Sequence, residues 1–508
     1  MILSKTKVLI IIMIALISCS NKEIIDYKPT TIDVIPIPNK VMKAAGFFEI
    51  NKKTSLVFDR SLKNSAGFFK QYLTKGLGIE ISGKSKNYSI VFSLDTAMVG
   101  IESYRITIDK ESLLIESPSD IGAFYAVQTL RQLLPPSFEN GTYGKDKVRL
   151  DLLKIEDSPR YEYRGFMLDV ARHFFNADEV KHVIDLISAY KINKLHLHLT
   201  DDQGWRIEIK SWPNLTESGS RSSVNNEKGG FYTQKDYLEI QAYALKKHIT
   251  IIPEIDMPGH INAALASYPE LNCDNKAREP YSGIKVGFSS LCIKNDVTYK
   301  FVDDVIRELS SMTTGNYIHI GGDESRKTDK DDYINFINKT REIVESYGKE
   351  PIGWDEIVDA DIESNAIVQF WGKVKNVKLA SQKGAKIIMS PSDKIYLDIK
   401  YNDSTKLGLT WAGLNDIKDA YNWKPDSLIE GVSGNNILGV EAPLWTETIV
   451  TPNDLEYMVF PRLIGVAEIA WSKEENLNWK NYKERLKKHT LRLDNLNINY
   501  YKSEYFNR

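Results

Sequence analysis

From residue 164 onward, short apolar runs of strand character alternate with longer amphipathic runs of helical character. This alternation is typical of βα units and a parallel sheet. The expected strands cover residues 165–170, 194–199, 250–255, 317–320, 351–354, 366–370, 386–389 and 437–440. Helical spacing falls between most of them, for example over 177–190, 234–247, 297–311 and 330–347. Eight such units predict an α/β fold with a closed (β/α)8 barrel, a TIM barrel, rather than an open doubly wound sheet.

The barrel pattern does not fill the chain of 508 residues. Ahead of it, strands are expected at 55–58, 104–108 and 113–117 and a helix at 121–134, which predicts a small α+β domain over residues 32–158. No catalytic constellation stands out there. The barrel is expected to span 159–472, and the helix-prone tail of 473–508 is expected to pack on its outside.

The charge balance excludes one class of partner. The chain has 66 basic and 68 acidic residues, a net charge of -2, and no basic stripe that could neutralise phosphates. Nucleic-acid binding is therefore not expected. No Gly-x-Gly-x-x-Gly or Walker-type loop follows an expected strand, which disfavours the nucleotide-binding α/β folds, and no cofactor is predicted.

The N-terminus predicts export. Lys5 and Lys7 precede an apolar run over residues 8–17, which is too short to span a bilayer and suits the core of a signal peptide. The Leu-Ile-Ser-Cys sequence that ends at Cys19 also resembles the bacterial lipobox, in which the cysteine is lipidated. Residues 1–19 are then a lipoprotein signal peptide and 20–31 a tether, so the protein is held at the membrane by lipid alone, on the periplasmic or cell-surface side. The alternative is an ordinary signal peptide with an incidental cysteine.

Chemically informative side chains follow nearly every expected barrel strand, where the active site of such a barrel lies. Acidic groups occur there together with tryptophans and a tyrosine. Pyranose faces stack on aromatic rings, while carboxylates and arginine bind hydroxyls in directional pairs, so this combination predicts a sugar pocket. The residues are Arg172, Asp201, His260, Asp323, Glu324, Trp354, Trp371, Tyr396, Asp398, Trp445 and Glu447.

The hexapeptide His-Ile-Gly-Gly-Asp-Glu at residues 319–324 is the most specific of these strand ends. Neighbouring residues of a strand face opposite sides, so only a bend at Gly321 and Gly322 turns both Asp323 and Glu324 toward one substrate. An adjacent acid pair can raise the pKa of one carboxyl and hold it protonated as a general acid. The alternative is a solvated acidic pair in a loop.

Two further groups of residues allow two interpretations each. His196 and His198 lie on one face of a strand and could bind a metal, but no second histidine pair follows at later strand ends, which favours packed, hydrogen-bonded rings and predicts no metal site. Cys273 and Cys292 lie in one long loop region of a chain expected to be exported. They form either a disulfide or two buried thiols.

The chain resembles family 20 of the glycoside hydrolases, the β-N-acetylhexosaminidases. The resemblance runs from about residue 32 to the end of the barrel and is carried by RGFMLDVAR at 164–172, LHLHLTDDQGWR at 195–206, PEIDMPGH at 253–260 and HIGGDE at 319–324. Weaker matches follow at 353–356, 369–372, 396–398 and 444–447. The resemblance implies an exo-acting retaining hydrolase of terminal β-linked GlcNAc or GalNAc, in which the substrate's acetamido group is the nucleophile and forms an oxazolinium intermediate.

The resemblance also implies residue roles. Glu324 is expected to be the general acid and base, Asp323 to orient the acetamido N–H, and Tyr396 to hold its carbonyl. Sugar hydroxyls are expected to bind Arg172, Asp398 and Glu447, and the ring and acetamido group to lie against Trp354, Trp371 and Trp445. Asp201 and His260 are expected to tune Glu324 through a hydrogen-bond chain. Residues 211–231 are expected to overhang the pocket.

Two rival hypotheses remain for the same sequence. A lipid-anchored glycan-binding protein on this fold is expected to have lost Asp323, Glu324 or Tyr396, and all three are present. A metal-dependent barrel hydrolase is expected to be inhibited by EDTA.

Overall fold

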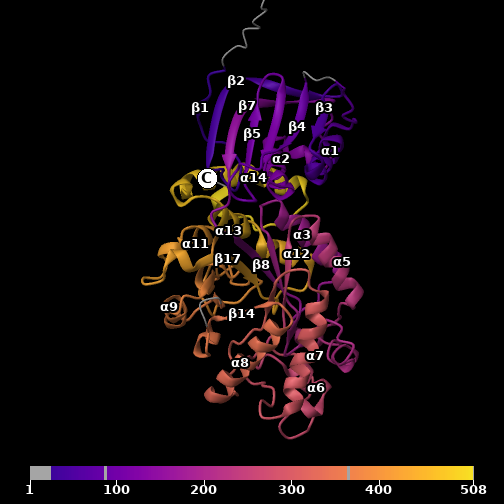
Figure 1. The fold of residues 1–508 in the computed structure, drawn as a ribbon, viewed down its shortest axis with the longest axis vertical. Helices are drawn as coiled ribbons and strands as arrows, with labels where there is room; N and C mark the ends of the chain where they lie inside the picture. Colours follow the sequence, from indigo (N-terminus) through magenta and orange to yellow (C-terminus); the bar gives the residue numbers. More distant parts are fainter. Residues whose placement is uncertain (1–24, 85–87, 363–365, 507–508) are drawn as a thin grey trace, which may run out of the picture.

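The computed structural model describes residues 25–84, 88–362 and 366–506. The predicted signal peptide with Cys19, and the first part of the predicted tether, lie outside the described residues. Two bodies follow each other along the long axis, a sheet domain in indigo and purple above a barrel in magenta and orange (Figure 1). Within the described ranges, no helix is long and apolar enough to cross a membrane.

The N-terminal domain is built on a seven-stranded mixed sheet in the order β1-β2-β7-β5-β6-β4-β3. Side chains along β7 alternate between exposed and buried, the pattern of a sheet with one solvated face. Helices α1 (Lys63–Leu77) and α2 (Asp120–Leu133) pack against each other and against this sheet. The strands are β1 Lys28–Pro29, β2 Lys40–Asn51, β3 Ser55–Phe58, β4 Ser89–Leu94, β5 Tyr104–Ile108, β6 Ser112–Ser117 and β7 Lys147–Asp157.

Eight parallel strands close the second domain into a barrel, in the order β12-β13-β14-β15-β16-β17-β8-β9. The predicted (β/α)8 fold is confirmed, and strand β17 closes it by pairing with β8, with Val440 opposite Arg164. Most strand residues are buried, because helices cover the outside and side chains fill the inside. The strands are β8 Tyr163–Asp169, β9 Lys194–His198, β12 Thr250–Glu254, β13 Tyr317–His319, β14 Glu350–Trp354, β15 Ile367–Phe370, β16 Lys386–Met389 and β17 Ile437–Leu444.

The barrel helices begin where the sequence supplies caps. The Asn176 side chain accepts from the backbone N–H groups of Asp178 and Glu179 at the start of α3, and the Glu179 carboxylate accepts from the Asn176 N–H in return. Thr233 and Asp236 do the same for α5. The longer helices are α3 Ala177–Ser188, α5 Gln234–Leu245, α7 Asp296–Met312, α8 Lys330–Ser346, α9 Val374–Gln382, α12 Pro452–Val459 and α13 Arg462–Trp471. The shorter ones are α4 Asn214–Glu217, α6 Asn262–Ser267, α10 Ser392–Ile395 and α11 Ile417–Tyr421.

The last helix, α14 (Trp479–Asn495), lies between the two domains (Figure 1). On the barrel side, Arg485 forms a buried ion pair of 2.6 Å with Glu468 of α13. On the sheet-domain side, Arg492 forms one of 2.5 Å with Glu139. The tail therefore packs against both domains, and not only against the barrel as the sequence led us to expect.

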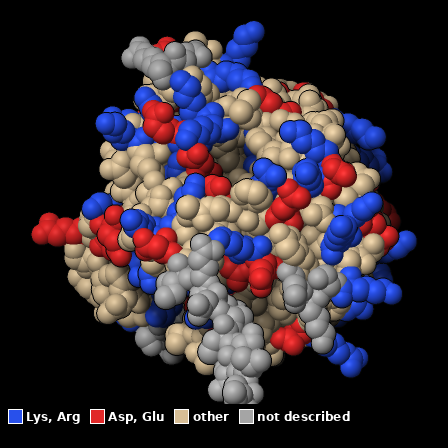
Figure 2. Space-filling view, turned by 90° about the horizontal axis from the view of Figure 1, so that it is seen from above, with Lys and Arg blue, Asp and Glu red and all other residues tan. Residues whose placement is uncertain are grey.

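Basic and acidic side chains are interspersed over the face seen from above (Figure 2). This mixing agrees with the net charge of -2 and with the absence of a basic stripe from the sequence.

Candidate active site

A cavity of about 360 Å³ opens among loops that follow the barrel strands. This volume is within the usual range for small-ligand sites. Its lining contains most of the side chains predicted from the strand ends, which come from many parts of the sequence. The residues are Arg172, His260, Ile284, Val286, Asp323, Glu324, Arg326, Trp371, Tyr396, Asp398, Leu409, Trp411, Trp445 and Glu447.

The backbone bends at the two glycines of the hexapeptide. Strand β13 ends at His319, and positive φ angles follow at Gly321 (67°), Gly322 (101°) and Glu324 (46°). Left-handed backbone costs a glycine little, whereas at Glu324 it is strained and must be held by its surroundings. The Gly322 N–H donates to Asp256 Oδ1 at 3.0 Å. This bend turns both carboxylates into the cavity, because both line it.

We expect Gly321→Ala to lower the free energy of unfolding by about 3 kcal/mol or more and to abolish activity. A Cβ at this position would lie 1.8 Å from Asp256 Oδ1, on a backbone of positive φ. Thermal unfolding and a hydrolysis assay measure the two effects. Gly372→Ala is the matched control, because nothing lies within 4 Å of a Cβ added there. Equal stability of the two variants would contradict the tight bend.

A chain of polar contacts runs behind the acid pair. His260 Nδ1 lies 3.1 Å from Asp201 Oδ1, and its Nε2 lies 3.7 Å from Glu324 Oε2 and 3.8 Å from Asp323 Oδ2. Asp201 is buried and also receives the Arg172 guanidinium at 2.7 Å. The structure therefore brings together the groups that the sequence analysis placed behind Glu324.

The two neighbouring acids have opposite pKa shifts. Burial, then the Glu356, Glu254 and Glu324 charges, raise the pKa of Asp323 to about 7, although His260 opposes them. Burial also acts on Glu324, but the contact and charge of His260, and then Arg326, hold its pKa below the ordinary glutamate value. From the sequence, the raised pKa was expected on the general acid. In the free site the acid with the raised pKa is Asp323, because it is the more deeply buried of the two and lacks an arginine, so it is protonated first as the pH falls below about 7.

The pH profile of kcat/KM on a substrate with a poor leaving group is expected to be bell-shaped. The active pair carries one proton, and the pair titrates as a unit. Above pH about 7 both acids are ionised and none can protonate the leaving group. Below the lowered pKa of Glu324 both are neutral, so the charge that orients the acetamido group is lost. A rate that keeps rising from pH 7 to about 9 would contradict this assignment.

The closed end of the cavity is polar and buried. Burial and the Glu447 charge raise the pKa of Asp398, and neither Asp398 oxygen has a side-chain hydrogen-bond partner in the described part of the chain. Arg172 lies with its guanidinium 4.8 Å from the centre of the Trp445 ring. Buried polar groups normally have partners, so Asp398, Glu447 and Arg172 are suited to bind the hydroxyls of a ligand.

The tryptophans are distributed differently from the prediction. Trp371 and Trp445 line the cavity, but Trp354 is only 1% exposed and lies behind, where it donates to Glu254 Oε1 at 2.8 Å and packs against Trp445. Trp411 lines the cavity with 55% of its surface exposed. It was missed because it lies in the long connection between β16 and β17, far from any strand end.

The rim of the cavity also differs from the prediction. Ile284 and Val286 line it, whereas no residue of 211–231 does. That segment supports the rim from outside, since the Asn225 N–H donates to the Ser282 carbonyl at 2.8 Å. Cys273 and Cys292 are joined by a disulfide, so they bracket the same loop.

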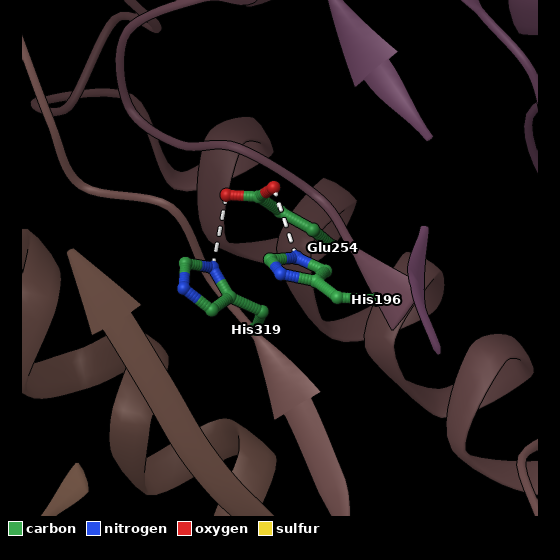
Figure 3. A group of neighbouring side chains, drawn as sticks. All are labelled: His196, Glu254 and His319. Atoms are coloured by element: carbon green, nitrogen blue, oxygen red, sulfur yellow. Dashed lines mark ion pairs between the residues drawn. The ribbon is translucent and has the colours of Figure 1, made fainter. Parts of the chain in front are cut away.

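A cluster of ionisable side chains fills the barrel beneath the cavity. Glu254 points between His196 and His319, with N–O distances of 3.1 and 2.9 Å (Figure 3). The geometry could be taken for a metal site. However, the same carboxylate also contacts His198 Nδ1 at 2.5 Å and Trp354 Nε1 at 2.8 Å, so its oxygens are already shared among protein donors.

We interpret this cluster as a buried hydrogen-bond network rather than a metal centre, because its carboxylate is saturated by charged and neutral donors. Full activity is expected after prolonged treatment with EDTA, measured by hydrolysis and by metal analysis of the treated protein. Loss of activity that Zn²⁺ restores would contradict the network.

The chain matches one family of known proteins over both of its domains. Residues 161–474 match the family model described as glycosyl hydrolase family 20, catalytic domain, and residues 31–158 match domain 2 of the same family. The chain is 40% identical to a β-N-acetylhexosaminidase of Cellulomonas fimi over 393 residues, 77% of this chain and 78% of the relative. It is 34% identical to a β-hexosaminidase of Porphyromonas gingivalis, over 96% of this chain and 67% of the relative.

Solved structures agree. The β-N-acetylhexosaminidase of Streptomyces coelicolor A3(2) has a TM-score of 0.91 at 42% identity, covering 94% of this chain and 99% of that one. A mutant β-hexosaminidase of Streptomyces plicatus in complex with the product GlcNAc has a TM-score of 0.91 at 43% identity, covering 94% and 98%. The fold, the cavity and these matches together show that the chain belongs to glycosyl hydrolase family 20. Its activity is that of a β-N-acetylhexosaminidase.

Proposed function

We propose that the protein removes terminal β-linked N-acetylhexosamine from the non-reducing end of glycans, with retention of configuration and with the substrate's acetamido group as nucleophile. The observation that carries this proposal is the common cavity of Asp323, Glu324 and Tyr396. Retention by a double displacement with two carboxylates needs them about 5 Å apart on opposite sides of the anomeric carbon. Two adjacent acids on one bend are suited instead to act on two different groups of the substrate, the leaving oxygen and the acetamido group.

In the first step the acetamido carbonyl oxygen attacks the anomeric carbon while the glycosidic bond breaks. Glu324 transfers its proton to the leaving oxygen. Asp323, as a carboxylate, accepts the acetamido N–H and stabilises the positive charge that spreads over the oxazolinium ring. The Tyr396 hydroxyl donates to the acetamido oxygen and holds it in line.

The same pair completes the reaction. Glu324, now ionised, takes a proton from a water molecule, and the oxygen of that water attacks the anomeric carbon and opens the ring. Binding of the substrate also changes which of the two acids carries the proton. The acetamido N–H favours the charged form of Asp323, so the single proton of the pair passes to Glu324.

The shape of the cavity supports cleavage at chain ends. Asp398 and Arg172 are buried and Glu447 is partly buried, so these residues form its closed end, whereas Arg326 and Trp411 are exposed and lie on its open side. A terminal sugar can fill this pocket with its hydroxyls paired to charged groups. An internal sugar residue of a glycan could not bind in the same way, because the glycan chain would have to continue through the closed end of the cavity.

Hydrolysis of aryl β-GlcNAc, β-GalNAc and β-glucoside by the purified protein tests the acetamido-assisted mechanism. We expect activity on the acetamido sugars and a kcat/KM for the glucoside lower by about 10³ or more, because the glucoside supplies no nucleophile. Comparable rates on the glucoside and on GlcNAc would contradict the mechanism. No activity on any acetamido sugar would favour the glycan-binding alternative.

We propose further that the protein is exported and anchored through lipid on Cys19. What supports this is the charged start, the apolar run and the position of the cysteine in the sequence. Expression with a radiolabelled fatty acid is expected to label the protein, and Cys19→Ser to release it unlabelled from membranes. An unlabelled, soluble wild-type protein would contradict the anchor.

A further inference from the structure

Arg326 is a part of the site that the proposed reaction does not use. Its Nη2 atom lies 2.5 Å from Glu324 Oε1, the carboxylate that has to deliver the proton. Arg326 lines the substrate cavity, and it also lines a second cavity of about 420 Å³ that shares Glu324 and Trp371 with the first. The guanidinium therefore lies where the two cavities meet, beside the carboxylate that in the proposed reaction protonates the leaving group.

The backbone and a neighbouring loop hold this arginine in place. The left-handed φ of Glu324 turns the chain back, and the Arg326 N–H donates to the Glu324 carbonyl at 2.6 Å. Its stem packs on Gly287, where an added Cβ would lie 2.9 Å from Arg326 Cδ. Although 65% of its side chain is exposed, the position of Arg326 is specified by close contacts.

The other cations of the second cavity pair with carboxylates that take no part in the proposed reaction. Lys373 pairs with Glu356 at 2.8 Å, and Lys330 with Asp359 at 3.6 Å. Glu324 is the partner of Arg326, and no second carboxylate of the described residues lies within ion-pair distance of it. Yet Glu324 must be neutral before it can act as an acid, whereas a guanidinium stays charged. When substrate is bound and Glu324 is protonated, the Arg326 guanidinium faces the leaving group and no longer has a carboxylate as its ion-pair partner.

We propose that Arg326 selects leaving groups that carry an anion, a carboxylate or a sulfate close to the glycosidic oxygen. This rests on the function proposed above, since it describes the leaving-group side of the same site. Planar guanidinium binds such anions by two parallel hydrogen bonds. The anion replaces Glu324 as the partner of the guanidinium, and its negative charge offsets the positive charge that opposes protonation of the catalytic acid. The preferred substrates are thus β-N-acetylhexosaminides of acidic sugars, carboxylated or sulfated.

Matched aryl β-GlcNAc substrates test this selection. The aglycones are 3-carboxyphenyl, 3-sulfophenyl and the neutral 3-carbamoylphenyl, and the proteins are wild type, Arg326→Gln and the control Lys327→Gln. Lys327 is exposed, adjacent in sequence and lines neither cavity. We expect the wild type and the control to prefer the anionic aglycones by about tenfold in kcat/KM, and Arg326→Gln to lose this preference. The relative rates with the carboxylate and with the sulfonate, which stands in for a sulfate, show which anion fits better.

The pH profile of kcat/KM on the neutral substrate is a second measurement. It would not change if Arg326 had only a structural role. Without the cation the pKa of Glu324 rises, so Arg326→Gln is expected to shift the acid limb of kcat/KM to higher pH. The anion preference of the wild type is also expected to shrink in high salt. An equal preference for anions in wild type and Arg326→Gln would overturn the proposal. Inactivity of every protein on the neutral substrate would instead overturn the proposed function.

Discussion

Glu324→Gln is expected to lower kcat/KM on a β-linked disaccharide by about 10³-fold, and on a dinitrophenyl glycoside far less. The amide cannot transfer a proton to the leaving oxygen. A sugar alkoxide needs that proton, whereas dinitrophenolate leaves without it. With the activated substrate the second step becomes limiting, because the same residue must take the proton from water, so kcat falls more than kcat/KM.

Steady-state kinetics on the two substrates measures this difference. The variant is also expected to lose the alkaline limb near pH 7, because the pair no longer shares a proton. Glu342→Gln, the same change at an exposed position of α8, is the matched control and is expected to behave as wild type. Equal losses on both substrates would contradict the acid role of Glu324.

Asp323→Asn is expected to lower kcat/KM by about 10²- to 10³-fold on both substrates alike, because its charge acts on the acetamido group and not on the leaving group. An amide side chain lacks that charge and cannot balance the oxazolinium ion. The insensitivity to the leaving group distinguishes this variant from Glu324→Gln in the same assay. A loss confined to poor leaving groups would show that the two acids have been assigned the wrong way round.

The same substitution is expected to stabilise the folded protein at alkaline pH. Burial raises the folded-state pKa of Asp323 from 3.8 to about 7, so wild type loses stability as pH rises through this interval. A shift of this size corresponds to a cost on the order of 4 kcal/mol above pH 7, which asparagine does not incur. Urea unfolding at pH 5 and pH 8 is expected to show a larger advantage of Asp323→Asn at pH 8. An equal or reversed difference would contradict the raised pKa of Asp323 in the folded protein.

The barrel could be predicted from the sequence because both the spacing of the apolar residues and the order of the apolar runs along the chain indicate it. Eight apolar runs, with helices between most of them, specify closure, and the strand ends then collect Arg172, Asp323, Glu324 and Tyr396 whatever the details of the loops. The sheet domain was harder. The pairing of β2 with β7 shifts register between Ala44 and Phe47, where Gly46 has a φ of 116°, and such a bulge breaks the alternation by which a strand is recognised.

The parts of the site that escaped prediction depend on three-dimensional neighbours. Trp354 ends β14 and Trp445 directly follows β17, and only packing decides that one is covered by the other. Trp411 reaches the cavity from a connection whose course no local pattern reveals. The order of the two pKa values follows from Arg326 and His260 on one carboxyl and from burial on the other. The sequence therefore identified the two acids but not which of them has the higher pKa.

The position of α14 has a consequence for how the two domains depend on each other. This one helix supplies the buried ion pairs of Arg492 with Glu139 and of Arg485 with Glu468. If α14 detaches, both Glu139 and Glu468 lose their arginine partners from this helix, one on each domain. The helix that follows the barrel in sequence thus secures the sheet domain that precedes it, which couples the loss of one domain to the loss of the other.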